Sequence, residues 1–169
     1  MSTARTKRTT GLASLASLAL LLALVAPAAA AEPAFEMDFP AGLACADFDL
    51  HVAGYGDGPQ VAREFTGREG TVLYLSAGTG YELTFTNTLT GATLSTRSNG
   101  AVNWTTVYPD GSGKMTLMGH NVVILFPADG GPSTTLYVGR AVIGIAADGT
   151  WTLGKVAGTA TDLCAALSS

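Results

Sequence analysis

The sequence predicts an all-β domain, in which an antiparallel meander of about nine or ten short strands forms a barrel or half-closed barrel. Two observations support this fold. Short runs of alternating apolar and polar residues recur at intervals of roughly 8–12 residues. Glycine accounts for 21 of the 169 residues, and many of these glycines fall between the runs. The connections are short, and closure would remove exposed strand edges, so a barrel is favoured over the alternative, a two-sheet β-sandwich.

The expected strands are residues 46–52, 61–66, 71–76, 81–86, 92–98, 101–108, 114–118, 122–126, 134–145 and 150–156. The alternation is clearest in the fourth of these, where Tyr81, Leu83 and Phe85 share one face. Residues 122–126 are apolar on both faces, which is typical of a buried central strand.

Three signals predict how these strands are connected. Asn99-Gly100 is the strongest hairpin signal in the chain, because both residues tolerate a positive φ angle. The segment 119–121 separates two strands and therefore places His120 in an exposed turn. Gly139 lies inside a long strand, where glycine indicates a bulge or a bend.

The first 31 residues have the pattern of a signal peptide. Basic residues at the N-terminus are followed by an apolar stretch over 11–27 and then by four alanines. Small side chains before the Ala31–Glu32 bond predict cleavage there, and hence a secreted, extracellular protein. The remaining chain divides into an extended N-terminal arm over 32–42 and a single β domain over 43–169.

The charge of the exported chain argues against several partners. Three of the nine basic residues lie within the first eight positions, so six remain against thirteen acidic residues, a net charge of −7. Such a domain is not suited to neutralising phosphates, which argues against a nucleic-acid partner. The same charge predicts repulsion from anionic lipid surfaces. After signal cleavage, no stable membrane insertion is expected.

Cys45 and Cys164 are the only two cysteines, and in an exported protein they predict a disulfide bond. The bond would fasten the C-terminal segment to the first strand of the domain. Asp162 is a suitable N-cap residue for a short helical turn through Leu167.

Three segments carry a resemblance: residues 87–91 (NTLTG), 130–140 (GGPSTTLYVGR) and 162–167 (DLCAAL). With them the chain resembles a group of small secreted proteins of actinomycete-type bacteria that carry no assigned function. The resemblance implies secretion and a β architecture, and it transfers no active-site residue.

The best polar constellation is Asp47, Asp49 and His51, which alternation places on one face of the strand over 46–52. Two carboxylates and an imidazole could begin a metal site or an acid–base pair. The simpler interpretation, which we favour, is an ordinary solvent-exposed face.

A second group consists of aromatic residues that could line a ligand cavity inside a barrel: Tyr81, Phe85, Trp104 and Tyr108. The competing interpretation makes them core or half-exposed sheet residues. No nucleophile elbow, phosphate loop or metal-ligand set is found in the sequence, so no cofactor is expected.

These observations favour a secreted, non-catalytic binding or interaction module. Its partner would be a small molecule, a protein or a cell-wall polymer. One alternative is a small extracellular β-barrel enzyme using Asp47, Asp49, His51 or Glu82 as acid–base groups. Another is a barrel that carries a small apolar ligand.

Overall fold

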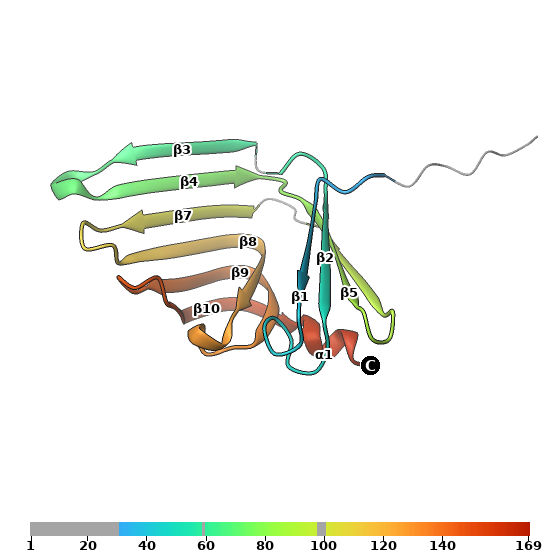
Figure 1. The fold of residues 1–169 in the computed structure, drawn as a ribbon. Coiled ribbons are helices and arrows are strands. Elements are labelled where there is room, and N and C mark those ends of the chain that lie inside the picture. The colour runs from blue at the N-terminus through green and yellow to red at the C-terminus, as the bar shows by residue number, and fades with distance from the viewer. Residues whose placement is uncertain (1–30, 59, 98–100) are drawn as a thin grey trace, which may run out of the picture. The chain divides into compact units, whose positions relative to one another are not determined.

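A computed structural model describes residues 31–58, 60–97 and 101–169, which form two antiparallel sheets and one short helix (Figure 1). The signal peptide is predicted over residues 1–31, of which 1–30 lie outside the described part of the chain, as does the Asn99-Gly100 turn itself.

Sheet A has the strand order β1-β2-β5-β6, with β1 (Phe35–Phe39), β2 (Leu50–Tyr55), β5 (Glu82–Asn87) and β6 (Thr93–Arg97). Sheet B has the order β10-β9-β8-β7-β4-β3, with β3 (Val61–Thr66), β4 (Val72–Gly78), β7 (Ala101–Val107), β8 (Gly113–Leu125), β9 (Ser133–Ile145) and β10 (Trp151–Asp162). Two 3-10 turns, η1 (Arg68–Gly70) and η2 (Pro127–Asp129), and the helix α1 (Leu163–Leu167) complete the described elements.

The all-β prediction is confirmed, but the strands do not close into a barrel. They divide between two sheets, so the two-sheet alternative is nearer to the structure. The predicted hairpin at Asn99-Gly100 is wrong, because β6 pairs with β5 in sheet A while β7 pairs with β4 and β8 in sheet B. Pairing and packing of whole strands override a local turn signal in this segment.

A row of three glycines bends sheet B. Gly119 of β8 lies opposite Gly139 of β9, which lies opposite Gly158 of β10. All three have positive φ angles, 88°, 127° and 123° in that order. A side chain at Gly139 would overlap the Ala157 carbonyl oxygen. Figure 1 shows β8 turning sharply before its end.

The bend confirms the role predicted for Gly139 and corrects the neighbouring prediction. The segments 114–118 and 122–126, expected as separate strands, join into the single strand β8 of 13 residues. His120 therefore lies within a strand, not in an exposed turn. Because strand pairing continues through Gly119 without a register shift, the chain bends there without ending the strand.

The two sides of the bent end of sheet B contribute to two separate apolar cores. The side facing sheet A contributes Val122, Ile124 and Leu136, which pack with Leu50, Val52 and Phe85 of sheet A and with Leu163 and Leu167 of α1. The opposite side folds back on the rest of sheet B, and its core contains Leu117, Val123, Leu125, Tyr137, Ala141 and Ile143. Burying a large apolar side chain contributes roughly 1.5–3 kcal/mol, so both cores stabilise the bend.

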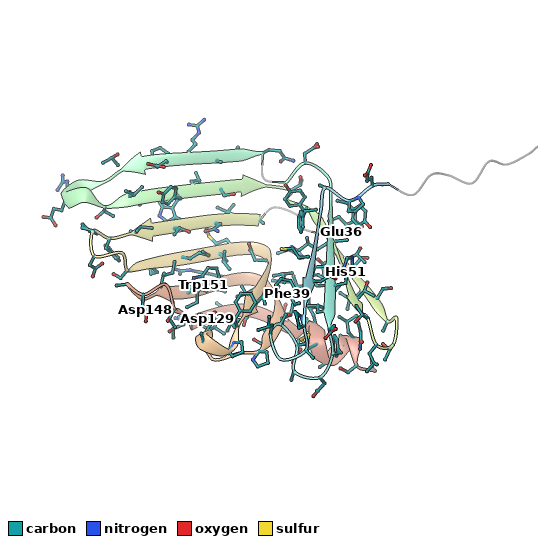
Figure 2. The ribbon with its side chains drawn as sticks, in the orientation of Figure 1. Glu36, Phe39, His51, Asp129, Asp148 and Trp151 are labelled. Carbon is teal, nitrogen blue, oxygen red and sulfur yellow. A yellow bond between two sulfur atoms is a disulfide. The ribbon has the colours of Figure 1, made fainter. Side chains whose placement is uncertain are left out.

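A disulfide and a side-chain hydrogen bond connect segments that are distant in sequence. Cys45 and Cys164 form the predicted disulfide, with Cα atoms 5.6 Å apart, and join the loop before β2 to α1. Asp129, in the connection between β8 and β9, accepts a hydrogen bond of 2.7 Å from the backbone N–H of Trp151 (Figure 2). This contact ties the bent end back to β10.

The sequence predicts the C-terminal end of the domain correctly but misses a strand at the N-terminal end. The predicted helical turn is confirmed, and the Asp162 side chain caps it by accepting from the backbone N–H of Ala165 at 3.0 Å. The segment 32–42 is more than an extended arm, because residues 35–39 form β1 and pair with β2.

Candidate functional site

The bend gives sheet B two faces of different character. We call the side toward which the sheet folds the inner face and the opposite side the outer face. On the inner face, Tyr74 lies opposite Thr105, and Ser76 lies opposite Asn103. These four residues belong to the two adjacent strands β4 and β7. They form a block of neutral side chains that can donate or accept hydrogen bonds.

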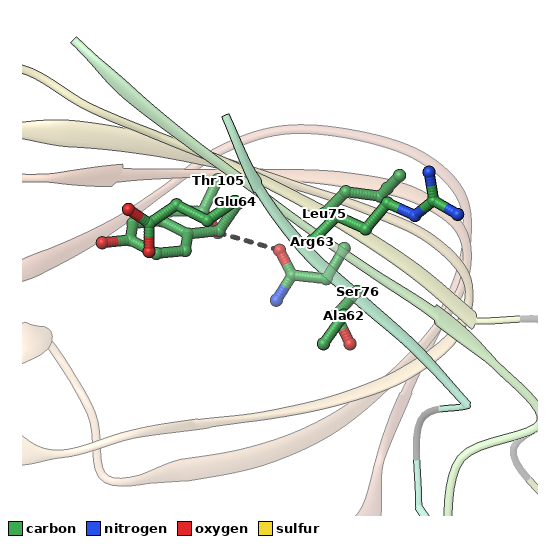
Figure 3. A pocket seen from close by; sticks show the side chains of 8 residues that line it. Ala62, Arg63, Glu64, Leu75, Ser76 and Thr105 are labelled. Carbon is green, nitrogen blue, oxygen red and sulfur yellow. Dashed lines mark hydrogen bonds between the residues drawn. The ribbon is translucent and has the colours of Figure 1, made fainter. Parts of the chain in front are cut away.

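This block lines a groove made of two adjoining hollows, of about 360 and 190 Å³, which share Ser76 and Asn103. The larger hollow extends over β3 to Glu64. The smaller one reaches Asn121, on the bent part of β8. Figure 3 shows Glu64 and Thr105 on one side of the sheet, with Arg63 and Leu75 projecting to the other. The bend at Gly119 thus supplies one end of the groove.

Several polar atoms in the groove are available to a ligand. The Thr105 hydroxyl donates to Asn103 Oδ1 at 2.9 Å, and within the described residues Asn103 Nδ2 makes no hydrogen bond. Asn121 Nδ2 donates to the Met118 carbonyl at 2.9 Å, which orients its side chain and leaves Oδ1 free to accept. The groove therefore offers both donors and acceptors that the described protein groups do not use.

The end of the groove beside Gly78 is held by Gln60. Its Nε2 donates to the Thr79 hydroxyl at 2.6 Å, and its Oε1 accepts from the Thr79 backbone N–H at 3.2 Å. A side chain at Gly78 would come within 2.7 Å of Gln60. Glycine at this position allows the close approach that holds the start of β3 against the end of β4 next to the groove.

The structure does not place the predicted constellation of Asp47, Asp49 and His51 on one strand face. Strand β2 begins at Leu50, so both aspartates precede it. Asp49 Oδ1 accepts from the Ala41 backbone N–H at 2.7 Å and shapes the loop. Asp47 lines a separate hollow beside α1.

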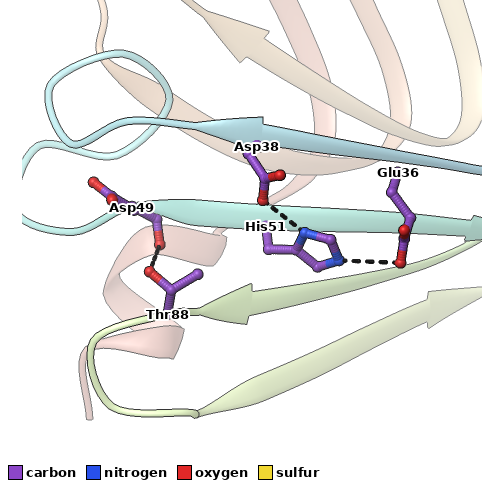
Figure 4. Close-up of polar contacts among 5 residues, drawn as sticks. All are labelled: Glu36, Asp38, Asp49, His51 and Thr88. Atoms are coloured by element: carbon purple, nitrogen blue, oxygen red, sulfur yellow. Dashed lines mark hydrogen bonds and ion pairs between the residues drawn. The ribbon is translucent and has the colours of Figure 1, made fainter.

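His51 instead contacts two carboxylates that sequence reasoning missed, Asp38 and Glu36 of β1 (Figure 4). Its Nδ1 lies 2.7 Å from Asp38 Oδ1, and its Nε2 lies 3.6 Å from Glu36 Oε1. The alternation of residues 35–39 could have revealed β1 and hence these partners. The cluster lies on the exposed face of sheet A, where Glu36 and His51 are both labelled in Figure 2. Among the described residues, no group of three potential ligands could hold a metal ion.

The four aromatic residues proposed to line one cavity lie at separate places. Phe85 is fully buried in the core between the sheets. Trp104 is on the outer face of sheet B, and Tyr108 is exposed beyond the end of β7. Tyr81 packs edge-on against Phe35, with ring centroids 4.9 Å apart, and lines a hollow of about 220 Å³ between the sheets.

That hollow also contains His120, for which the sequence predicted an exposed turn. His120 Nδ1 is buried and, within the described part of the chain, has no hydrogen-bond partner. A buried unsatisfied nitrogen is costly unless a ligand or water meets it, so the hollow is the second candidate site.

Two turn carboxylates have shifted acidities. The hydroxyl and the backbone N–H of Ser112 donate to Asp110 and lower its pKa from the ordinary value. The backbone N–H of Thr150 lowers the pKa of Asp148 in the same way. Both aspartates stabilise hairpin turns, away from the groove.

No protein family, curated protein or solved structure matches this chain. The resemblance drawn from residues 87–91, 130–140 and 162–167 therefore stays a prediction. None of the helices in the described residues is long and apolar enough to cross a membrane.

Proposed function

We propose that the protein is exported and acts as a non-catalytic binding module, whose inner-face groove takes up a hydroxyl-rich ligand such as an extracellular oligosaccharide. The observation that carries this proposal is the pair of adjoining hollows joined by Ser76 and Asn103. The disulfide between Cys45 and Cys164 is compatible with an extracellular location.

The chemistry of the groove suits sugar hydroxyl groups. Hydroxyl and amide side chains both donate and accept, as sugar hydroxyls do, and they do so without a charge to desolvate. The Tyr74 side chain, which is 44% exposed, offers an aromatic surface with a polar end. An open groove over neighbouring strands can also accommodate a chain of several sugar units.

The same groove gives little support to the enzyme alternative. Hydrolysis of a glycosidic bond ordinarily needs two carboxyl groups across the cleaved bond, and Glu64 is the single carboxylate among the lining residues. The imidazole of His51, with a carboxylate beside each ring nitrogen, is not among the residues that line this groove.

Calorimetric titration with soluble fragments of bacterial wall and capsular glycans tests the proposal. For a fragment that binds, Asn103→Ala should weaken binding roughly 5- to 13-fold, because it removes hydrogen bonds worth about 1–1.5 kcal/mol. Thr116→Ala is the matched control, because Thr116 lies on β8 on the opposite face of the sheet. Equal losses in the two variants, or no binding by any glycan class, would contradict the proposal.

Export has its own test. The intact mass of the protein recovered from the medium of an actinomycete host should correspond to a chain beginning at Glu32. A mass that retains the first 31 residues would refute cleavage at Ala31–Glu32.

A second candidate function is uptake of a small amphiphile in the hollow between the sheets. It is favoured by the unpartnered Nδ1 of His120, beside the apolar rings of Phe35 and Tyr81. Native mass spectrometry of the secreted protein should then show a bound mass that disappears on denaturation. His120→Phe should abolish that mass, while His51→Phe, outside the hollow, should retain it.

A further inference from the structure

The outer face of sheet B is an apolar surface that the residues described by the structure leave uncovered. Strand pairing places one side chain from every second position there. The apolar members on the four strands β3, β4, β7 and β8 are Val61, Phe65, Leu73, Leu75, Ala77, Val102, Trp104 and Met118. Four of them are large and strongly exposed: Val61 at 39%, Phe65 at 43%, Trp104 at 39% and Met118 at 40%.

Sheet A does not bury this surface. The core shared by the two sheets takes Val122, Ile124 and Leu136 from sheet B, and all three lie beyond the bend at Gly119. The unbent part of the outer face is therefore open. Across the five interstrand steps from β3 to β10 it spans roughly 24 Å, since neighbouring strands lie about 4.8 Å apart. This is the scale of a surface contact, not of a small-molecule pocket.

The charges on this face all have one sign. Arg63, Lys114 and Arg140 share it by register, and Lys155 lies in the bulge of β10 opposite Val142. These are four of the six basic residues that follow Ala31. Within the strands of sheet B, no acidic residue shares this face by register. Within the described residues, none of the four makes an ion pair.

This combination selects one kind of occupant. A second copy docked by the same face would set these four basic groups against their own counterparts, with no acidic residue to neutralise them. An anionic polymer alone would leave the exposed Trp104 and Phe65 unused. A bilayer with anionic headgroups matches both features, because apolar side chains enter the headgroup–acyl boundary while basic groups meet the phosphates.

We propose that the outer face of sheet B is a docking surface for anionic phospholipid membranes. It lies on the opposite side of the sheet from the groove, so a docked molecule keeps the groove facing the solution. The net charge of −7 for the exported chain, from six basic and thirteen acidic residues, by itself predicts that anionic membranes repel the protein. The local charge of the outer face is the opposite, because its charged strand residues are basic. The acidic cluster of Glu36 and Asp38 is on the solvent-exposed face of sheet A. Screening over about 8–10 Å at physiological salt weakens the effect of charges that are distant from the contact.

Vesicle flotation with the cleaved, disulfide-bonded protein tests this inference. Vesicles of phosphatidylcholine containing one quarter phosphatidylglycerol should bind the protein, and vesicles of phosphatidylcholine alone should not. The double variant Arg63→Gln/Arg140→Gln should bind about 25-fold more weakly, at about fivefold for each basic residue. Each single variant, Arg63→Gln or Arg140→Gln, should bind about fivefold more weakly. Arg68→Gln, in the turn η1, removes one positive charge as each of these does, and as their control it should change binding less than twofold.

A second readout reports the apolar contact. The tryptophan fluorescence should shift to shorter wavelength with the anionic vesicles, and Trp104→Phe should remove that shift while Trp151 still emits. Absence of binding to the anionic vesicles would overturn the proposal, as would binding that does not depend on phosphatidylglycerol. Sedimentation that shows a dimer lost in Trp104→Ser would assign the face to a second copy instead. The groove proposal is independent of all these outcomes, because its ligand and its variants lie on the inner face.

Discussion

Substitution of Gly139 by alanine should destabilise the domain strongly, because the bend of sheet B depends on this position. The φ angle of 127° is one that residues with a side chain rarely adopt, and such strain costs on the order of 1–3 kcal/mol. The new methyl group would also overlap the Ala157 carbonyl oxygen and come within 3.0 Å of Gly158 Cα. Both contacts are with backbone atoms of β10, which cannot move aside as a flexible side chain could.

Together these effects predict a loss of about 3–5 kcal/mol, a large part of the 5–15 kcal/mol that is typical for a domain. At about 4 °C per kcal/mol, the melting temperature should fall by roughly 12–20 °C. Gly91→Ala is the matched control: its φ is 76°, and nothing lies within 4 Å of the added carbon. It should cost about 1–2 kcal/mol. Urea unfolding with the disulfide intact measures both variants, and equal losses would refute the role assigned to the glycine row.

Three further predictions concern cross-links and turns. Replacing Cys45 and Cys164 by alanine should lower the free energy of unfolding by about 4–5 kcal/mol, since the bond closes a loop spanning 119 residues; a loss below 1 kcal/mol in denaturant titration would contradict this. Asn87→Ala should lower the free energy of unfolding, measured by thermal denaturation, by about 2–3 kcal/mol, because the buried side chain donates to the Leu167 carbonyl and accepts from the Leu89 backbone N–H. Thr88→Ala, at an exposed neighbouring residue, is the control and should lower it by less. Hydrogen bonds from Ser112 lower the pKa of Asp110 below its ordinary 3.8, so the ionised carboxylate stabilises the fold at pH values above 3.8 and loses this contribution as the pH falls through its folded-state pKa. The difference in unfolding free energy between wild type and Asp110→Ala should therefore narrow from pH 6 to pH 2. A difference that stays constant over this range would refute the prediction.

Local patterns were sufficient to predict most strands and the helix cap. Residues 61–66 alternate weakly, and their predicted bounds agree with those of β3. Asp162 has the side chain and position of an N-cap, and it caps α1. Each of these features depends on neighbours in sequence, which a single sequence contains.

Features that depend on distant contacts were missed. Asn99-Gly100 has the local preference for a hairpin, but its flanking strands find partners in different sheets. The sequence around Gly119 and His120 predicts a turn between two strands. In the structure Gly119 lies in one row with Gly139 and Gly158, and the strand bends there and continues.

The candidate sites show the same division. The sequence predicts His51 as a candidate site residue but not its carboxylate partners on β1, because it predicts only an extended arm over 32–42. The groove residues Ser76 and Asn103 are 27 positions apart and become neighbours through the pairing of β4 with β7. Nothing in their own segments distinguishes them from ordinary sheet residues. The fold was therefore more predictable than the site.

The most direct test of the account is a map of backbone amide shifts while a binding oligosaccharide is titrated into the ¹⁵N-labelled protein. The account predicts that the largest shifts fall on the inner face, at Tyr74, Ser76, Asn103 and Thr105, and that Trp104 and Thr116 on the outer face change little. Shifts concentrated on the outer face, or spread evenly over both faces, would contradict the assignment of the groove as the binding site.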